Sequence, residues 1–242
     1  MSSGVYGVLS GAKARMQMLD TISDNLSNAQ TVGFKKGQAV FEARLEAARS
    51  GLAARGVDYA RIEEGFTDFT QGALSRTNVP LHLAIDGEGF FKVQDAGGSV
   101  FYTRQGNLRL DTGGGLLTAD GLQMLDDEGR PIALPRPDVE IDEEGNVFLD
   151  DGEMKKIPLY TFDDLSILKR QGGGMFVADP AAVEQRVAEP RIYRGQLEDA
   201  NINLMQEMGQ MVDSMRVFEA CQKMLKTYHD LAGKANELGI VA

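Results

Sequence analysis

The sequence has few of the residues that build disulfides and zinc sites. Its 242 residues include one cysteine, Cys221, and two histidines, His82 and His229, which are far apart in the chain. A single cysteine cannot close a disulfide within the chain, and these three residues are too few for a structural zinc cluster. We therefore expect neither a disulfide scaffold nor a zinc protein.

Long apolar runs are also missing. No stretch approaches the roughly 18 apolar residues of a membrane-spanning helix. A cleavable secretory signal needs a basic start and then about 7–15 apolar residues, but Lys13, Arg15, Asp20 and Asp24 interrupt the first 30 residues. We expect no membrane insertion, and export, if it occurs, without a cleaved signal peptide.

Basic residues are outnumbered: 25 Lys and Arg stand against 36 Asp and Glu, which gives a net charge of −11. This balance argues against a nucleic-acid backbone or an anionic membrane as the main partner. Hydrophobic residues make up 43% of the chain and charged residues 25%. Both values are typical of a globular protein with a buried core.

Proline is absent from both ends of the chain. All seven prolines lie between residues 80 and 190, and residues 46–195 carry a net charge of −10. We therefore expect four segments. They are an N-terminal helical segment over 1–45, a connecting region over 46–82, a central domain over 83–195 and a C-terminal helical segment over 196–242.

Apolar residues near the N-terminus recur in steps of three or four, which predicts one apolar stripe on a helix. The stripe comprises Val5, Leu9, Ala12, Met16, Leu19, Ile22 and Leu26. Gly4, Gly7 and Gly11 each disfavour a helix by about 1 kcal/mol relative to alanine. We therefore expect the helix over 11–28, with the first ten residues loose.

The C-terminal segment has a similar pattern and predicts a helix over 204–238, about 50 Å long. Its stripe comprises Met208, Met211, Met215, Phe218, Leu225, Tyr228, Ala232, Ala235 and Leu238, with Cys221 or Gln222 filling the step between Phe218 and Leu225. A long helix with a narrow stripe typically packs on another helix, and the N-terminal stripe is the expected partner. This packing can occur within one chain or between subunits, and the many methionines favour the second alternative because methionine adapts to different neighbours.

The central segment predicts short antiparallel strands joined by tight turns. Apolar or alternating runs at 90–93, 107–110 and 139–141 are followed by Asp-x-x-Gly turns, the run at 100–103 follows one, and the run at 146–149 ends at Asp150-Asp151-Gly152. These turns supply a short polar side chain and a glycine that accepts positive φ. The fold class predicted is therefore α+β, with coiled-coil-like terminal helices and a mainly antiparallel β central domain.

No catalytic, metal-binding or cofactor-binding set emerges from the residues. Asp138, Glu140 and Asp142 alternate, but Gly145 comes too late for an EF-hand loop. The glycine clusters lack the further glycine or lysine of a nucleotide-binding motif. Cys221 lies on the predicted stripe, where a buried, unreactive thiol is expected. We expect no catalytic residue, no metal ligand and no cofactor.

Three motifs together resemble the bacterial flagellar rod and hook family of axial proteins. The first is residues 19–36, LDTISDNLSNAQTVGFKK. The second is residues 83–93, LAIDGEGFFKV, continued by YTRQGNL at 102–108 and LTADG at 117–121. The third is ANINL at 200–204, and the similarity continues at scattered positions through residue 225. Within the family, residues 1–9, residues 70–74, and Met205 together with residues 216–219 resemble the proximal more than the distal rod proteins.

The resemblance implies a noncatalytic subunit of the basal-body rod, in which terminal helices polymerise into a tube and the acidic β domain lies outside. The implied partners are copies of itself, neighbouring rod subunits and the flagellar export apparatus, in a rod that crosses the periplasm. We predict an assembly interface formed by Leu9, Met16, Leu19, Ile22, Leu26, Asn28, Gly33, Phe34, Met208, Met211, Met215, Phe218, Leu225 and Tyr228. Gly33 is expected to take positive φ and Phe34 to anchor the chain where it leaves the helix.

An alternative of another class is a self-contained secreted β protein. In that case the terminal helices pair within one monomer, and the acidic face binds a cation or a basic partner. An enzyme is disfavoured because no set of residues supports one. This alternative predicts a compact monomer in which both terminal segments are protected from exchange with solvent, whereas terminal helices that await assembly partners should exchange quickly.

Overall fold

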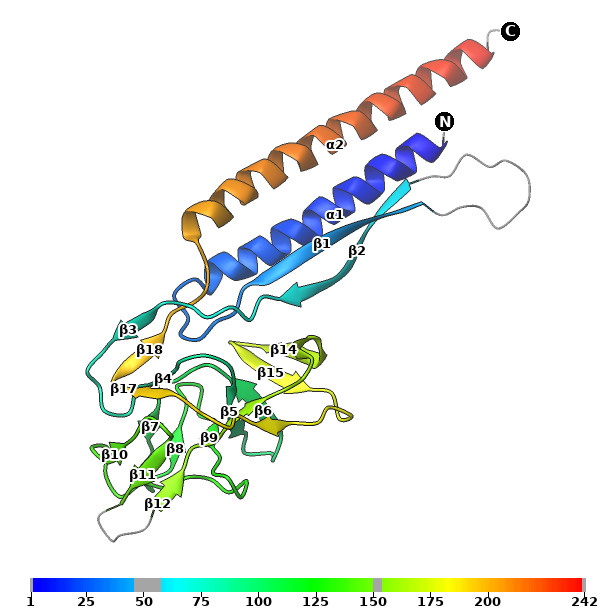
Figure 1. The fold of residues 1–242 in the computed structure, drawn as a ribbon. Helices are drawn as coiled ribbons and strands as arrows, with labels where there is room; N and C mark the ends of the chain where they lie inside the picture. The colour runs from blue at the N-terminus through cyan, green and yellow to red at the C-terminus, as the bar shows by residue number, and fades with distance from the viewer. Residues whose placement is uncertain (1, 46–57, 150–153, 241–242) are drawn as a thin grey trace. The chain divides into compact units, whose positions relative to one another are not determined.

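The computed structural model describes residues 2–149 except 46–57, and residues 154–240 (Figure 1). The chain divides into two units. Unit 1 consists of Met1–Ser27, Gly37–Phe66 and Asn203–Ala242, and unit 2 consists of Asn28–Lys36 and Thr67–Ile202. Residues 28–36 were expected to belong with the N-terminal helix, but the structure groups them with the β domain.

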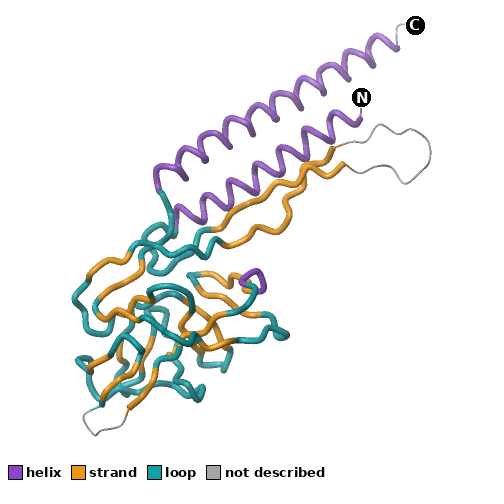
Figure 2. Tube along the Cα trace, in the orientation of Figure 1, coloured by secondary structure: helices purple, strands orange, loops and turns teal. Residues whose placement is uncertain are grey.

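The elements follow one another in an α, β, α order, and Figure 2 shows that helix is concentrated at the two ends of the chain. The predicted α+β class is confirmed. The elements are α1 (Ser2–Ser27), β1 (Gly37–Leu45), β2 (Asp58–Thr67), β3 (Leu74–Arg76), β4 (Leu83–Ile85), β5 (Phe90–Gln94), β6 (Val100–Thr103), β7 (Arg109–Leu110), β8 (Leu116–Leu117), β9 (Gln123–Met124), β10 (Glu140–Ile141), β11 (Asn146–Phe148), β12 (Met154–Lys156), β13 (Leu159–Thr161), η1 (Leu165–Ile167), β14 (Leu168–Gly172), β15 (Met175–Ala178), β16 (Gln185–Arg186), β17 (Ile192–Arg194), β18 (Gln196–Glu198) and α2 (Leu204–Ile240).

In unit 1, α1 and α2 lie side by side and antiparallel (Figure 1). The expectation that the first ten residues are loose is wrong, because α1 begins at Ser2 and continues through its glycines. A Cβ built on Gly4 would lie 2.9 Å from the Tyr228 hydroxyl. Glycine therefore lets α2 approach, and packing against α2 outweighs the low helix propensity.

A hairpin of β1 and β2 completes unit 1, and β1 packs against α1. The sequence analysis assigned no strands to this stretch. Residues 46–57, which belong to the predicted connecting region, lie outside the described residues.

Unit 2 is built from antiparallel pairs, as the turn pattern predicts. Its largest sheet has the order β14-β15-β6-β5-β9-β8-β7, and β13 joins β5 to β16. Smaller sheets pair β10-β11-β12, β17-β4 and β18-β3. The last two pairs join strands more than 100 residues apart, so the chain entering the domain lies beside the chain leaving it.

The Asp-x-x-Gly turns share one geometry. The side chains of Asp95, Asp111, Asp126 and Asp142 each accept hydrogen bonds of 2.7–3.0 Å from the backbone N–H groups two and four residues later. The glycine three residues after each aspartate has a φ between +78° and +88°. The aspartate thus supplies the turn's acceptor, and the glycine supplies the left-handed conformation.

Strand β5 supplies side chains to two cores because successive residues point to opposite faces of a sheet. Phe91 and Val93 join a large aliphatic core with Leu83, Ile85 and Met124. Phe90 joins a second, aromatic core, whose other members are Tyr102, Tyr160, Phe162, Leu168 and Phe176. Unit 2 therefore buries a substantial apolar core of its own.

We predict that Gly145→Ala destabilises the protein by roughly 3 kcal/mol, since left-handed backbone costs an alanine about 1 kcal/mol and forced displacement of a neighbour adds about 1–3 kcal/mol. A Cβ on Gly145 would lie 2.5 Å from the Ile157 carbonyl oxygen, whereas one on Gly121, at a similar φ, meets nothing within 4 Å. Gly121→Ala is the control and should cost about 1 kcal/mol. Urea unfolding measures both variants, and equal losses would contradict the argument.

We also predict that Asp126 makes a pH-dependent contribution to the free energy of unfolding. Burial alone would raise the pKa of its carboxyl, but the N–H groups of Arg130 and Glu128 stabilise the carboxylate, and the net pKa lies below the ordinary value. The stabilisation is therefore present above the unfolded-state pKa of about 3.9 and is lost as pH falls through the lower folded-state pKa. Asp126→Asn should be less stable than wild type at pH 7, and the gap should narrow below about pH 4. A gap that stays constant in acid unfolding would show that ionisation is not involved.

Candidate functional site

The side chains buried in the helices of unit 1 are mostly small or polar. They are Ala12, Ala14, Ile22 and Asn25 in α1, and Glu207 and Ser214 in α2. Asn25 is the main polar contact: its Nδ2 donates to the Gly37 carbonyl (2.9 Å) and to Glu207 Oε2 (3.3 Å), and its Oδ1 accepts from the Gly37 N–H (2.8 Å). Asn25 thereby joins α1, β1 and α2.

Large apolar side chains, by contrast, stand exposed on both helices. They are Tyr6, Leu9 and Met16 in α1, and Leu204, Met205, Met208, Val212, Met215, Val217, Met224, Tyr228 and Leu231 in α2. Met205 is 79% exposed and Leu231 is 55% exposed. An exposed array of this extent is a candidate interaction surface.

The predicted interface residues fall into three groups. Leu9, Met16, Met208, Met215 and Tyr228 are exposed; Leu19, Leu26, Asn28, Met211, Phe218 and Leu225 are half-buried; and Ile22, Gly33 and Phe34 are buried. The single stripe expected on each helix is therefore divided between a covered and an uncovered side. An α-helix turns once in 3.6 residues, so a stripe read at a 3.5-residue repeat drifts around the axis.

Gly33 and Phe34 lie inside unit 2, where they hold the segment that follows α1. Gly33 has a φ of +66°, and a Cβ on it would lie 2.4 Å from the Arg104 carbonyl group. The Phe34 side chain is 1% exposed, and the Arg170 guanidinium stacks over its ring at 4.6 Å. The predicted positive φ and the predicted anchor are both confirmed.

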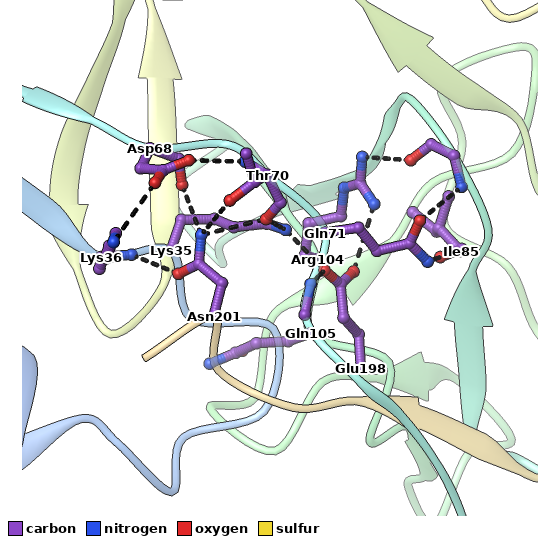
Figure 3. Close-up of polar contacts among 12 residues, drawn as sticks. Lys35, Lys36, Asp68, Thr70, Gln71, Ile85, Arg104, Gln105, Glu198 and Asn201 are labelled. Atoms are coloured by element: carbon purple, nitrogen blue, oxygen red, sulfur yellow. Dashed lines mark hydrogen bonds and ion pairs between the residues drawn. The ribbon is translucent and has the colours of Figure 1, made fainter. Parts of the chain in front are cut away.

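The next residue, Lys35, begins a buried ionic group that we call the junction cluster: Lys35, Arg104 and Glu198, with Thr70, Gly72 and Asn201 around them (Figure 3). Lys35 Nζ lies 2.5 Å from Glu198 Oε1 and 2.7 Å from the Thr70 carbonyl oxygen. Arg104 Nη1 lies 3.2 Å from Glu198 Oε2. One carboxylate therefore holds two cations, and all three side chains are at most 4% exposed.

Hydrogen bonds with backbone groups and with Asn201 complete the junction cluster. Gly72 N–H donates to Glu198 Oε1 at 2.9 Å. Asn201 Oδ1 accepts from the Lys36 N–H at 2.7 Å, and its Nδ2 donates to the carbonyl oxygens of Asp68 and Thr70 (Figure 3). The cluster thus ties together residues 33–36, 68–72 and 198–201.

Burial shapes the electrostatics of this group. Loss of hydration lowers the pKa values of Lys35 and Arg104 below their ordinary values, and Glu198 opposes the decrease in each. Removing a charge from water is costly unless a partner compensates for it. Glu198 is that partner for both cations, so the arrangement depends on its charge.

The sequence analysis did not single out Lys35, Arg104 or Glu198. Lys35 and Arg104 each lie within a motif quoted for the family resemblance, and Asn201 lies within the third motif. The signal was therefore present as sequence similarity. What no spacing rule could show is that the three motifs meet around one buried carboxylate.

In the part of the chain that the structure describes, no helix is long and apolar enough to cross a membrane. Nor do three or more His, Cys, Asp or Glu side chains gather there in a way that could hold a metal ion.

Comparison with known proteins matches three family models along the chain. Residues 8–35 match the flagella basal body rod protein model, residues 84–149 the flagellar hook protein FlgE/F/G D1 domain, and residues 193–238 the flagellar basal body rod FlgEFG protein C-terminal model. Each match contains one of the motifs that meet at the junction cluster.

Curated relatives match over nearly the whole length. The flagellar basal-body rod protein FlgF of Caulobacter vibrioides is 31% identical, with 98% of each chain covered. FlgF of Mesorhizobium japonicum is 31% identical over 93% of each chain, and FlgG of Borreliella burgdorferi is 29% identical over 98% of this chain and 99% of its own. The chain belongs to the flagellar basal-body rod protein family.

We predict that Glu198→Gln destabilises unit 2 by roughly 3–5 kcal/mol, because it leaves two buried cations without a counterion. The matched control is Lys36→Met: Lys36 pairs with Asp68 at 3.6 Å near the surface, and its loss should cost less than about 1 kcal/mol. Chemical denaturation of the full chain measures both variants. A Glu198→Gln variant as stable as the control would contradict the assigned role of the cluster.

Proposed function

We propose that this protein is a noncatalytic structural subunit of the bacterial flagellar basal-body rod, and that it polymerises through α1 and α2 to form part of the axial drive shaft. The observation that carries the proposal is the uncovered apolar surface of the helix pair. The pair leaves many of its large apolar side chains exposed, with Met205, Met208 and Met224 all at least 51% exposed. A helix pair built in this way needs neighbours to cover that surface.

The same observation separates the proposal from the self-contained β protein. Helix pairing within one chain fits both accounts. The self-contained alternative, however, needs the large apolar residues to be covered by that pairing, and they are exposed. Methionine predominates among them, and its flexible side chain suits contacts with nonidentical neighbours.

The partners proposed are copies of the same chain and neighbouring rod subunits, in the part of the basal body that crosses the periplasm. Export is proposed through the flagellar export apparatus without cleavage of a signal peptide. The FlgF and FlgG relatives support a rod position, and we assign the chain to the proximal, FlgF type. This assignment rests on the FlgF relatives at 31% identity and on the motifs at 1–9 and 70–74 and at Met205 with 216–219.

We predict that Val212→Asp blocks rod assembly without unfolding the monomer. Val212 is 48% exposed, so a carboxylate there costs little in the free chain but is desolvated when a neighbour packs on it. Thr227→Asp, on an exposed polar part of α2, is the control.

Both variants are produced in cells that lack their own copy of the gene. Val212→Asp should abolish swimming and be absent from purified basal bodies, and Thr227→Asp should support both. Thermal unfolding of each purified chain should match wild type. Normal swimming with Val212→Asp would contradict the proposal.

A further inference from the structure

From Met205 onward, the exposed apolar residues of α2 form two rows, each in a different half of the helix. The first row is Met205, Met208, Val212 and Met215, and the second row is Val217, Met224, Tyr228 and Leu231. At 3.6 residues per turn, the rows lie roughly 160° apart around the axis. The strip that contains the buried Glu207 and Ser214 runs along the side between them that is covered in the monomer.

Each row covers only half of its side of α2, and we call these two sides the flanks. C-terminal to the first row, the same flank carries Glu219, Lys226 and Asp230. On the other flank, Gln206, Gln210 and Asp213 precede the second row. If the α2 helix of a second copy packed parallel and in register, each apolar row would therefore face polar side chains of the other helix.

The two rows have the same internal spacing. Met208, Val212 and Met215 are separated by steps of four and three, and so are Met224, Tyr228 and Leu231. The second set lies 16 residues after the first, which corresponds to about 24 Å along the helix at 1.5 Å per residue. A shift of this size brings one row alongside the other.

The charges of the two halves are opposite. Residues 204–219 contain Glu207, Asp213, Arg216 and Glu219, a net charge of −2, whereas residues 220–234 contain Lys223, Lys226, Asp230 and Lys234, a net charge of +2. A shifted parallel neighbour places the negative half beside the positive half. Contacts between unlike halves are attractive, and contacts between like halves are repulsive.

We propose, resting on the function proposed above, that the occupant of each row is the α2 helix of a second copy of this chain. The first row of one copy packs against the second row of a parallel neighbour displaced by about 24 Å along the axis. Because the two surfaces in contact are different, the interaction is heterologous and continues from copy to copy. Such contacts generate an open helical filament and not a closed dimer.

Disulfide crosslinking in assembled rods tests the pairing. On a Cys221→Ser background, cells lacking their own gene produce two tagged forms, one with Met208→Cys and one with Met224→Cys, positions that are 52% and 51% exposed. Oxidised basal bodies should contain about tenfold more of the mixed disulfide than of either like-with-like disulfide, since only unlike positions are held together. Arg216→Cys with Thr227→Cys, on the polar face between the rows, is the control pair and should not crosslink.

The outcomes separate this proposal from the function on which it rests. Tagged wild-type chain absent from the basal bodies would contradict the proposed function and this inference with it. Chain present in the basal bodies, with like-with-like disulfides or control disulfides in excess, would overturn the shifted pairing and leave the rod function standing.

A charge exchange provides a second test that does not depend on assembly of the cysteine forms. Met208→Asp and Met224→Lys should each abolish swimming, and the double variant should regain it because each aspartate then faces a lysine of the neighbouring copy. Self-pairing of each row would instead put Asp against Asp and Lys against Lys. A double variant with no gain in swimming over the single variants overturns the pairing.

Discussion

The β domain depends on one buried carboxylate. Glu198 holds the Lys35 ammonium at 2.5 Å and the Arg104 guanidinium at 3.2 Å, and it also accepts the Gly72 N–H. These contacts join the segment that enters unit 2 to the segment that leaves it. Because buried charges are stable only when compensated, the ends of the β domain are fastened by an interaction that tolerates little substitution. The domain is complete in itself, with its own aliphatic and aromatic cores.

The helix pair differs from the β domain in which side chains it buries. Its buried positions hold mainly small and polar residues, among them Ala14, Asn25 and Ser214, whereas many of its large apolar residues, such as Met205 and Leu231, are exposed. Burial of an exposed methionine or leucine gains roughly 1.5–3 kcal/mol, and in the single chain this gain is not realised. Unit 1 therefore leaves apolar surface that neighbours can bury, whereas unit 2 buries large apolar side chains within its own cores. This difference is what a subunit of a polymer needs: one stable part and one part that is completed by assembly.

Much of this architecture was predictable from local rules, and the parts that were not depend on distant contacts. The long C-terminal helix, the aspartate turns, the positive φ of Gly33 and the burial of Phe34 all follow from periodicity or turn chemistry. The early start of α1 did not, because it depends on packing against α2, where Gly4 leaves room for Tyr228. The β18–β3 pairing and the Lys35–Glu198 pair each join residues more than 100 positions apart. A single sequence holds no spacing rule for such pairs.

The most direct test of the account is backbone hydrogen exchange on the dilute, monomeric chain. Residues 2–27 and 204–234 should exchange quickly because their helices lack the neighbours that stabilise them. Residues 83–149 and the segment 33–36, held by the junction cluster, should exchange slowly. Equally slow exchange in the terminal helices of a proven monomer would show that the helix pair is already complete. That result would contradict assembly through its exposed rows and favour the self-contained alternative.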